Sequence, residues 1–438
     1  MLGSFIKKGA TCIAHQSAAY PLPSKIFSRG FTRSLLAFRS EHLPSRSEDG
    51  INSPKAKSSA SKTGGNIHIL RKHPRSLSTL HLSAAPIAVT GTAASKDESR
   101  EFMAVFPDVV RDLTDAGRHL DVPDATKWYS KALQYNVPTG KRNRGLALVL
   151  SYRLLAHPDE LTEESLKLAR ILGWCVELLQ AFFLVVDDVM DGAEMRRGKP
   201  CWYRKDGIGT AAVNDGILLE GGIYQLLRRH FRDKPYYMDM VELFHDVTLK
   251  TSMGQTLDLL TSQFGKKPQL DLFTMARYNA IVKYKTAYYS FQLPVALAMY
   301  MTGKRDPEVH RQAKTILLEM GQFFQVQDDF LDCFGNPEIT GKVGNDIEDG
   351  KCTWLVVVAL QRANKEQRAL LEECYGSKDP ACVSAVKALY EELGLPATYA
   401  IFEEESYNLI RTHIQQISRG LPHKLFFKFL EKIYRRAS

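Results

Sequence analysis

Long uninterrupted hydrophobic segments are missing from this 438-residue sequence. A membrane-spanning helix needs about 18 consecutive residues that are almost all apolar. The run WLVVVAL at 354–360 is too short, and Glu177 and Gln180 interrupt the apolar stretch 174–186. We therefore predict no membrane span and a soluble mature protein, since a hydrophobic content of 44% is ample for a buried core.

Cysteines spaced as metal ligands or as a disulfide framework are also missing. The seven cysteines are scattered, and none forms a CxxC pair. This pattern favours neither a structural zinc site nor disulfides. We expect a reducing compartment.

Acidic residues are almost absent from the start of the chain, where Glu41 stands alone in the first 47 positions. Residues 1–95 hold thirteen Lys or Arg and three Asp or Glu, a net charge of +10, whereas the remaining residues have a net charge of −1. The formal charge of +9 is therefore a property of the leader. The rest of the chain gives no electrostatic reason to expect nucleic acid as a partner.

The leader is rich in Ser, Arg and Lys, as in a mitochondrial transit peptide. A secretory signal would need an apolar run of about 7–15 residues, which Lys7, Lys8 and His15 interrupt. A disordered basic tail is the alternative. We predict a leader at 1–95, a single catalytic domain at 96–438, and a mitochondrial location, or a cytosolic one if the leader is absent or not used.

Strand-like alternation bounded by hairpin turns is likewise missing. From about residue 98 onward, apolar residues recur every three or four positions, which is typical of helices. Thr162 precedes two acidic residues and is a candidate helix start. Several segments are apolar nearly all round, as in helices buried inside a bundle. The sequence thus predicts one all-α domain, a helical bundle.

One pattern is present twice: FFLVVDDVMD at 182–191 and FFQVQDDFLD at 323–332. On a helix, residues i and i+4 share a face, so Asp187 and Asp191 project together. Asp328 and Asp332 repeat this spacing. Burying such clusters uncompensated would cost many kcal/mol, and divalent cations would remove that cost.

Mg²⁺ commonly takes one or two carboxylates and completes its shell with water and substrate phosphates. Two opposed aspartate helices can therefore hold a polyphosphate through bridging metals. The spacing excludes a calcium EF-hand. A two-metal nuclease stays open, but the phenylalanines before each acid pair form an apolar wall that suits a greasy tail better than a nucleic-acid backbone.

Basic motifs accompany the acids. TGKRNRG at 139–145 leads into a predicted helix start and suits a phosphate, MRRG at 195–198 could grip a diphosphate, and KYKTAYYSF at 283–291 adds a further lysine. A solvated turn, a surface ion pair and surface lysines are the respective alternatives. Taken together, the motifs describe a site for more than one diphosphate.

With GQTLDLL at 254–260 and TGKVGNDIEDGKCTW at 340–354, these motifs resemble those of the trans-prenyltransferases, most closely the farnesyl diphosphate synthases of animal type. The similarity runs from about residue 100 to Tyr434. It implies a helical bundle around a deep central cavity, a homodimer, and head-to-tail condensation of isopentenyl diphosphate with the allylic dimethylallyl and geranyl diphosphates. It also implies Mg²⁺, with three ions per site and Mn²⁺ or Co²⁺ as substitutes.

The resemblance further implies roles for individual residues. The metal ligands would be Asp187, Asp191 and Asp328, supported by Asp188, Asp329 and Asp332. The allylic diphosphate would be held by Arg196, Lys285, Thr286, Gln325, Lys342 and Lys351. Isopentenyl diphosphate would be held by Lys141, Arg144, Gln180 and Arg197. Lys285, Thr286 and Gln325 would be the catalytic residues, with Thr286 and Gln325 beside the developing carbocation.

Product length follows from helix geometry. Phe182 and Phe183 precede Asp187 by five and four residues, which places them roughly 6 to 7.5 Å deeper along a helix axis. Their bulk should stop growth at farnesyl diphosphate, although they could also be ordinary core residues. A geranyl or dual product, a terpene cyclase on the same fold, and a non-catalytic scaffold are the remaining alternatives. The basic isopentenyl set argues against the cyclase, and the two complete aspartate motifs argue against the scaffold.

Overall fold

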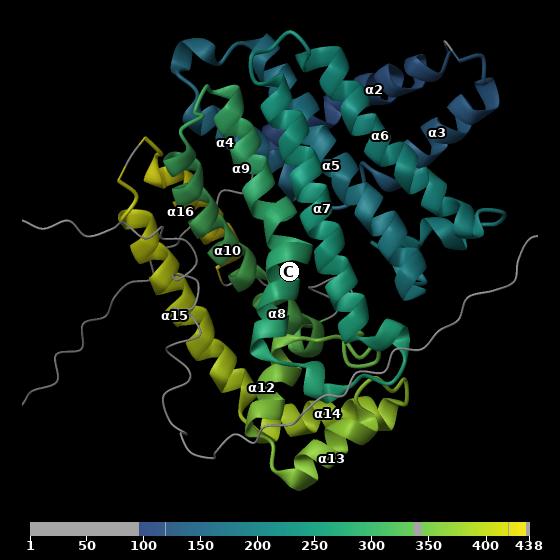
Figure 1. Cartoon of the computed structure of the whole chain (residues 1–438), viewed down its shortest axis with the longest axis vertical. Helices are drawn as coiled ribbons and strands as arrows, with labels where there is room; N and C mark the ends of the chain where they lie inside the picture. The colour runs from purple at the N-terminus through teal and green to yellow at the C-terminus, as the bar shows by residue number, and fades with distance from the viewer. Residues whose placement is uncertain (1–95, 119, 337–343, 419, 435–438) are drawn as a thin grey trace, which may run out of the picture. The chain divides into compact units, whose positions relative to one another are not determined.

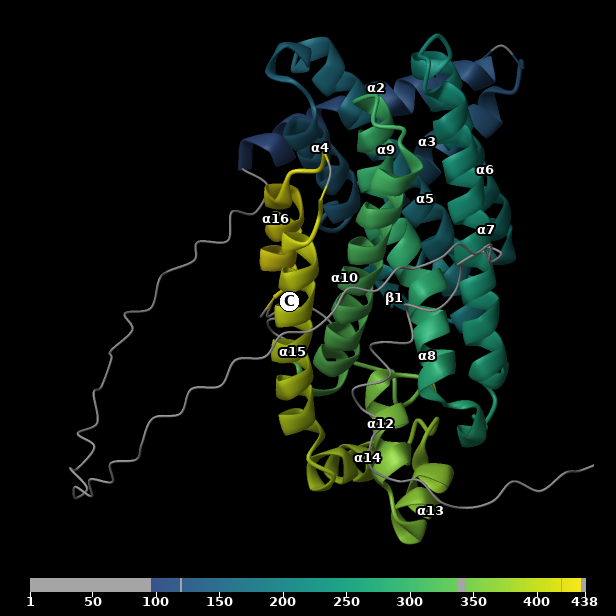
Figure 2. The same ribbon diagram turned by 60° about the vertical axis from the view of Figure 1, so that its left-hand side comes forward.

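The computed structural model describes residues 96–118, 120–336, 344–418 and 420–434. The predicted leader and Lys342 lie outside these ranges. Within them, the long helices α7 (Tyr237–Thr261), α10 (Pro307–Phe334) and α15 (Leu395–Gln415) run in roughly the same direction, whereas α2 (Lys96–Arg118) runs across them (Figure 1). Helices α12 (Trp354–Arg362), α13 (Lys365–Cys374) and α14 (Pro380–Glu392) lie at one end. Figure 2 shows α15 and α16 beside α10, and both helices pack against α10.

The long elements are almost all helical, as the periodicity predicts. The helices are α2 (Lys96–Arg118), α3 (Pro123–Asn136), α4 (Asn143–Leu155), α5 (Glu163–Asp191), α6 (Ala212–Phe231), α7 (Tyr237–Thr261), α8 (Met275–Ile281), α9 (Leu293–Met301), α10 (Pro307–Phe334), α12 (Trp354–Arg362), α13 (Lys365–Cys374), α14 (Pro380–Glu392), α15 (Leu395–Gln415) and α16 (His423–Ile433). Short 3₁₀ turns are η2 (Pro158–Glu160), η3 (Trp202–Arg204), η4 (Gly209–Ala211), η5 (Gln263–Gly265) and η6 (Leu270–Leu272). The π-helical segment is η7 (Val282–Gln292).

Helix α5 forms the centre of the larger core. It begins where predicted, because the Thr162 side chain accepts a hydrogen bond from the Ser165 N–H in a capping box. It ends at Gly192, whose φ of 67° is the left-handed conformation that glycine adopts without strain. Its side chains pack against α2, α4 and α6.

Among the described residues, one helix, α5, is long and apolar enough to cross a membrane. By length and composition alone this one described helix qualifies, with a mean hydropathy of 1.7 over its most apolar window. Glu177 and Gln180 lie inside this helix, and 78% of that window is buried inside the protein. The apolar surface of α5 is therefore buried against neighbouring helices of the protein.

A smaller core surrounds α12, against which α8 and α10 pack. Its buried residues include Trp354, Tyr375 and Tyr390. Phe323 of α10 belongs to the larger core, and Val326, about one turn further along the helix, belongs to the smaller core. Helix α10 therefore joins the two cores, and its C-terminal end carries the second aspartate motif between them.

The segment from α8 through η7 to α9 is one continuous helical rod whose middle is π-helical. Glycines on two sides let neighbouring helices approach it closely. A Cβ on Gly254 of α7 would lie 2.2 Å from the Lys285 backbone nitrogen, and one on Gly321 of α10 would lie 2.4 Å from the Ala287 Cβ. Helices α7 and α10 therefore pack tightly against η7 next to Lys285 and Thr286. Such π-helical segments are often found at functional sites.

One element was absent from the sequence prediction: a hairpin in which β1 (Met195–Arg196) pairs antiparallel with β2 (Lys199–Pro200). Arg197 and Gly198 form its turn, both with positive φ (54° and 73°), as a two-residue type I′ turn requires. Strands of two residues are too short to leave an alternation in the sequence.

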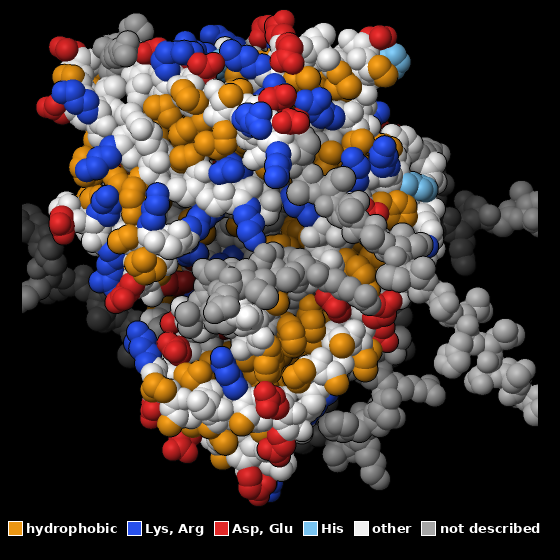
Figure 3. All heavy atoms as spheres, turned by 180° about the vertical axis from the view of Figure 1, so that it is seen from behind, with side chains coloured by type: hydrophobic (Ala, Val, Ile, Leu, Met, Phe, Trp, Pro, Cys, Tyr) orange, Lys and Arg blue, Asp and Glu red, His pale blue; other side chains and the backbone are white. Residues whose placement is uncertain are grey.

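Lys and Arg side chains are interspersed with Asp and Glu on the face seen from behind (Figure 3). This mixture agrees with the nearly neutral composition of residues 96–438.

Candidate active site

The first aspartate motif occupies the last turn and a half of α5. Asp188 is buried and accepts hydrogen bonds from Arg196 Nε and Nη2 at 2.9 and 2.5 Å. Asp187 and Asp191 lie one turn apart on the helix. Burial, and to a smaller extent repulsion from Asp187, raises the pKa of Asp191, whereas the charges of Lys351 and Lys285 oppose that rise. Two carboxylates that repel each other at one site favour a bound cation.

The second motif ends α10, and its three aspartates have different surroundings. Asp329 is buried, and Oδ2 accepts from the Tyr278 hydroxyl at 2.7 Å and the Trp354 N–H at 2.8 Å. Burial raises the Asp329 pKa to about 7. Asp332 accepts from the Asp346 N–H at 3.0 Å and is also buried. Asp328 remains partly exposed, so it is the member of this motif best placed for a soluble ligand.

Two lysines connect the first motif to other elements. Lys285 of η7 lies 3.7 Å from Asp187, and Lys351, just before α12, donates to Asp191 at 2.9 Å. Asp258 of α7 accepts from Lys285 Nζ at 2.6 Å. Four elements therefore meet around a cluster of carboxylates and ammonium groups.

Sequence reasoning missed two residues of this cluster, although both lie within the GQTLDLL motif. Gln255 Nε2 donates to Asp187 Oδ1 at 2.7 Å, and Asp258 holds Lys285. Their spacing of three residues, which puts them on one helix face, was the signal available in the sequence. It could not show which groups that face would meet.

Thr286 and Gln325, both predicted to lie beside the developing carbocation, are in contact with each other. The Thr286 hydroxyl donates to Gln325 Oε1 at 3.0 Å, and Gln325 Nε2 donates to Asp329 Oδ1 at 2.9 Å. The oxygen and the nitrogen of the Gln325 side-chain amide are thus both hydrogen-bonded, which fixes the orientation of the amide. The carbonyl oxygen faces the hydroxyl of η7.

The residues predicted for isopentenyl diphosphate form a second basic group at the start of α4. Arg144 donates to Gln180 Oε1, to the Tyr289 hydroxyl at 2.9 Å and to Ser290 Oγ at 2.7 Å. Arg197 donates to the Thr139 hydroxyl at 2.9 Å. Lys141 lies beside them, one residue before the left-handed Arg142 that precedes α4. The prediction that this segment lies at a helix N-terminus is confirmed.

Hydrogen bonds to α6 hold the hairpin that carries Arg196 and Arg197 in place. Asp215 of α6 is buried, and its two carboxylate oxygens accept from the Trp128 and Trp202 indole N–H groups, each at 2.7 Å. Trp202 lies two residues after the end of β2. This doubly hydrogen-bonded carboxylate fixes the base of the arginine hairpin against α3 and α6.

The apolar part of the site lies deeper on α5. The Phe182 and Phe183 rings are 4.9 Å apart between centroids, and the Phe183 and Tyr289 rings are 5.8 Å apart. Both phenylalanines are partly buried against the larger core. They stand one turn before Asp187 in the helix, as predicted.

A cavity of about 400 Å³ adjoins the basic group. Lys141, Arg144 and Lys432 contribute charge to its lining, and Phe291 and Phe324 contribute apolar surface. Burial and the neighbouring Lys141 charge lower the Lys432 pKa. A cluster of cations in one partly enclosed space is suited to an anion.

Among the residues that the structure describes, no three His, Cys, Asp or Glu side chains converge closely enough to hold a metal ion by themselves. Mg²⁺ does not require such a cage, because it keeps waters and binds through one or two carboxylates and substrate phosphates. Asp187 and Asp191 fit that role, since each already faces a lysine and Asp187 also accepts from the Gln255 amide. The assignment of Asp187, Asp191 and Asp328 as metal ligands stays a prediction.

Comparison with known proteins agrees with this arrangement. The polyprenyl synthetase family model matches residues 126–393. The chain is 50% identical over 384 residues to the farnesyl pyrophosphate synthase of Murgantia histrionica, covering 88% of this chain and 93% of that protein. It is 52% identical over 340 residues to that of Gallus gallus, covering 77% and 92%.

Solved structures show the same fold. A T. brucei farnesyl diphosphate synthase complexed with risedronate superposes with a TM-score of 0.71 at 33% identity, covering 77% of this chain and 99% of that one. The chain thus belongs to the polyprenyl synthetase family of all-helical prenyltransferases. Within that family it groups with the farnesyl pyrophosphate synthases.

Proposed function

We propose that this protein condenses isopentenyl diphosphate head to tail with dimethylallyl diphosphate and then with geranyl diphosphate, giving farnesyl diphosphate. The observation that carries the proposal is the meeting of Lys285 and Lys351 with Asp187 and Asp191. In a chain half identical to farnesyl pyrophosphate synthases, this cluster provides both the metal ligands and the cations that an allylic diphosphate needs.

The allylic substrate would lie with its diphosphate at this cluster and its tail toward the phenylalanines. Lys285, Lys351 and Arg196 would donate to the diphosphate oxygens, where negative charge develops as the carbon–oxygen bond breaks. Mg²⁺ held by Asp187, Asp191 and Asp328 would supply Lewis-acid stabilisation of the same leaving group. Lys342, outside the described residues, is assigned to this group by resemblance alone.

The second substrate would lie on the basic group at the start of α4. Lys141, Arg144 and Arg197 would bind the isopentenyl diphosphate, and Gln180 orients Arg144 through their hydrogen bond. The isopentenyl double bond would attack the allylic cation beside Thr286 and Gln325. The departed diphosphate would take the proton that is lost, so no further side-chain base is required.

The surrounding apolar side chains would keep water from the cation. Phe182 and Phe183 would also limit the growing tail, because their rings fill the space one turn below Asp187. These two rings favour the fifteen-carbon product.

Product analysis tests the proposal directly. The protein is incubated with Mg²⁺, isopentenyl diphosphate and either dimethylallyl or geranyl diphosphate, and the products are identified by chromatography and mass spectrometry. Farnesyl diphosphate supports the proposal. A ten-carbon end product would instead make it a geranyl diphosphate synthase, and a hydrocarbon formed without isopentenyl diphosphate would make it a terpene cyclase.

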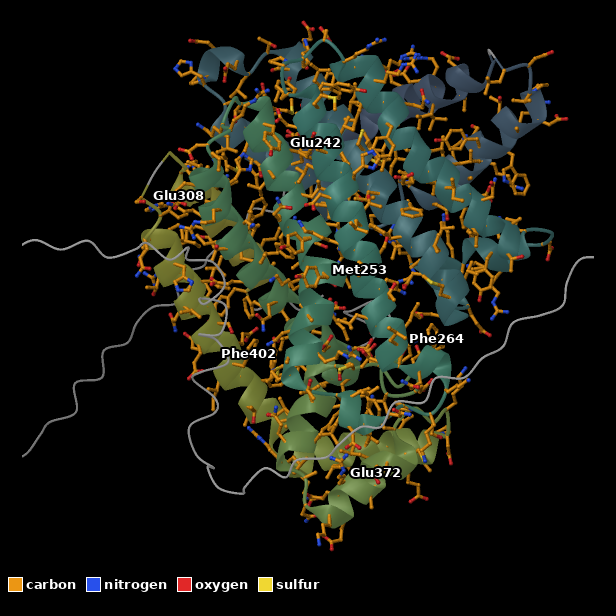
Figure 4. All side chains as sticks on the ribbon, in the orientation of Figure 1. Glu242, Met253, Phe264, Glu308, Glu372 and Phe402 are labelled. Carbon is orange, nitrogen blue, oxygen red and sulfur yellow. The ribbon has the colours of Figure 1, made fainter. Side chains whose placement is uncertain are left out.

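We also propose a homodimer formed through α6 and α7. Large apolar side chains are exposed on these helices, including Ile217, Leu249 and Met253 at 59%, 64% and 63% of their surface. Figure 4 labels Met253 on α7 and Phe264 just beyond its end. Met253→Glu should dissociate the dimer in analytical ultracentrifugation, whereas Ile401→Glu on α15, with a similarly exposed side chain (61%), should not.

For residues 1–95 we propose mitochondrial targeting, supported by their basic, acid-poor composition. A fluorescent fusion of the full chain should enter mitochondria, and a fusion of 96–438 should remain in the cytosol. A cytosolic full-length fusion would refute this assignment.

A further inference from the structure

Asp258 is a buried carboxylate to which neither the motifs nor the proposed reaction assigned a role. It lies one turn before the end of α7, with 5% of its surface exposed. A carboxylate this buried needs partners, because an unpaired buried charge costs several kcal/mol. Its partners are two lysines from distant parts of the chain.

Both ammonium groups approach the same oxygen atom. Lys285 Nζ lies 2.6 Å and Lys351 Nζ 3.8 Å from Asp258 Oδ2. Burial would raise the Asp258 pKa, but Lys285 and Lys351 together lower it below its ordinary value. The carboxylate is therefore ionised at neutral pH, and it offsets the repulsion between the two cations.

Each lysine also faces one aspartate of the first motif. Lys285 is 3.7 Å from Asp187, and Lys351 is 2.9 Å from Asp191. Those two aspartates are the proposed metal ligands, so metal binding would turn their oxygens away from the lysines. Asp258 is not one of the proposed metal ligands. It would remain the shared counter-ion while the lysines turn toward a diphosphate.

We propose that Asp258 is a positioning residue that holds Lys285 and Lys351 side by side, so that both donate to one diphosphate when Asp187 and Asp191 bind metal. This inference rests on the proposed allylic diphosphate site. The change in anion affinity that it predicts for loss of Asp258 is opposite in sign to that of a simple charge effect. Removing a negative charge from an anion site should strengthen anion binding, whereas releasing the two lysines should weaken it.

The test measures binding of inorganic pyrophosphate with Mg²⁺ to the full chain by isothermal titration calorimetry. We expect Asp258→Asn to raise the pyrophosphate Kd at least about tenfold, within the range found when one member of a buried charge pair is removed. Asp258→Glu should fall between this variant and the wild type, because it restores the charge with a longer side chain.

The matched control is Asp246→Asn on the same helix. Asp246 also pairs with a lysine, Lys250 at 2.5 Å, but its side chain is 50% exposed. We expect a pyrophosphate Kd equal to that of the wild type. Wild-type protein that fails to bind pyrophosphate with Mg²⁺ would refute the proposed site itself, whereas a folded Asp258→Asn protein that binds as tightly as wild type would refute only the role of Asp258.

A double-mutant comparison covers the case in which Asp258→Asn does not fold. The Lys285→Gln/Lys351→Gln protein lacks the cations that Asp258 would position, so adding Asp258→Asn to it leaves no unpaired buried lysine. We expect the triple variant to bind pyrophosphate at least as tightly as the double variant. The weakening caused by Asp258→Asn acts through the two lysines that both variants lack, and the loss of a negative charge does not by itself weaken anion binding. A further weakening in the triple variant would show that Asp258 acts otherwise and would overturn the inference.

Discussion

Lys351 Nζ donates a 2.9 Å hydrogen bond to Asp191 Oδ2, although 160 residues separate them in the sequence. The contact joins the segment before α12 to the end of α5. It places the Lys351 ammonium group against Asp191, a predicted metal ligand from a distant part of the sequence. The charge balance of the site therefore depends on tertiary packing.

Asp191→Asn should lower kcat/KM for geranyl diphosphate by about 100-fold or more, because losing several kcal/mol of metal-based stabilisation has that effect on a rate. The variant retains its shape but loses the charge that attracts Mg²⁺. Steady-state kinetics over a range of Mg²⁺ concentrations measures the effect. Asp271→Asn, whose side chain is 90% exposed, should behave as wild type. Wild-type turnover in an excess of EDTA would contradict the metal dependence.

Phe183→Ala should shift the products from fifteen toward twenty carbons. The Phe183 ring closes the space between Phe182 and Tyr289, and its removal would let the tail pass deeper along α5. Chromatography of the dephosphorylated products made from labelled isopentenyl diphosphate gives the distribution. Phe264→Ala is the control, since Phe264 is 64% exposed. An active Phe183→Ala enzyme that still stops at fifteen carbons would show that this ring is only a core residue.

Gly254→Ala should reduce both stability and activity. The new Cβ would lie 2.2 Å from the Lys285 nitrogen and 2.6 Å from the Tyr284 carbonyl carbon, so α7 and η7 would have to separate. We expect a loss of about 2–3 kcal/mol in the free energy of unfolding, as for other overpacked positions. Urea denaturation followed by circular dichroism measures it.

Gly221→Ala on α6 is the matched control for that substitution. Its Cβ would meet no atom of the described structure within 4 Å, and alanine is the better helix former. Stability should rise by about 0.5–1 kcal/mol. Equal losses for the two alanine variants would contradict the close approach at η7.

Glu177→Gln should change how stability depends on pH. Burial raises the pKa of this carboxyl above its ordinary value of 4.5, against the lowering effects of the Gly145 N–H and the Arg144 charge. The folded state thus holds its proton to higher pH than the unfolded chain, and stability falls as pH rises from 4.5 through the folded pKa. Glutamine has no proton to lose and keeps an oxygen for the Gly145 N–H.

The measurement is the Tm of metal-free protein between pH 4 and pH 8, and the Tm of Glu177→Gln should rise relative to wild type as pH increases. Glu366→Gln, at an exposed position on α13, should follow the wild-type curve. Parallel curves for Glu177→Gln and wild type would rule out an elevated Glu177 pKa.

Local sequence was sufficient wherever the argument depended on neighbours along one helix. Thr162 starts α5, and Phe182, Phe183, Asp187 and Asp191 fall at the helical spacing that their positions dictate, because a 3.6-residue period fixes relations between residues three to five apart. The all-α fold followed from the same periodicity. The apolar character of α5 was also visible in the sequence, and its burial agrees with the prediction of helices buried inside a bundle.

What the tertiary structure decided is which of these faces meet. Asp329 belongs to a motif identical in spacing to that of Asp188, yet it is enclosed by Tyr278 and Trp354, while Asp188 pairs with an arginine of the hairpin. Asp258 gained its two lysines only when α7, η7 and the segment before α12 came together. Such contacts depend on packing across long separations, and one sequence records the residues but not their partners.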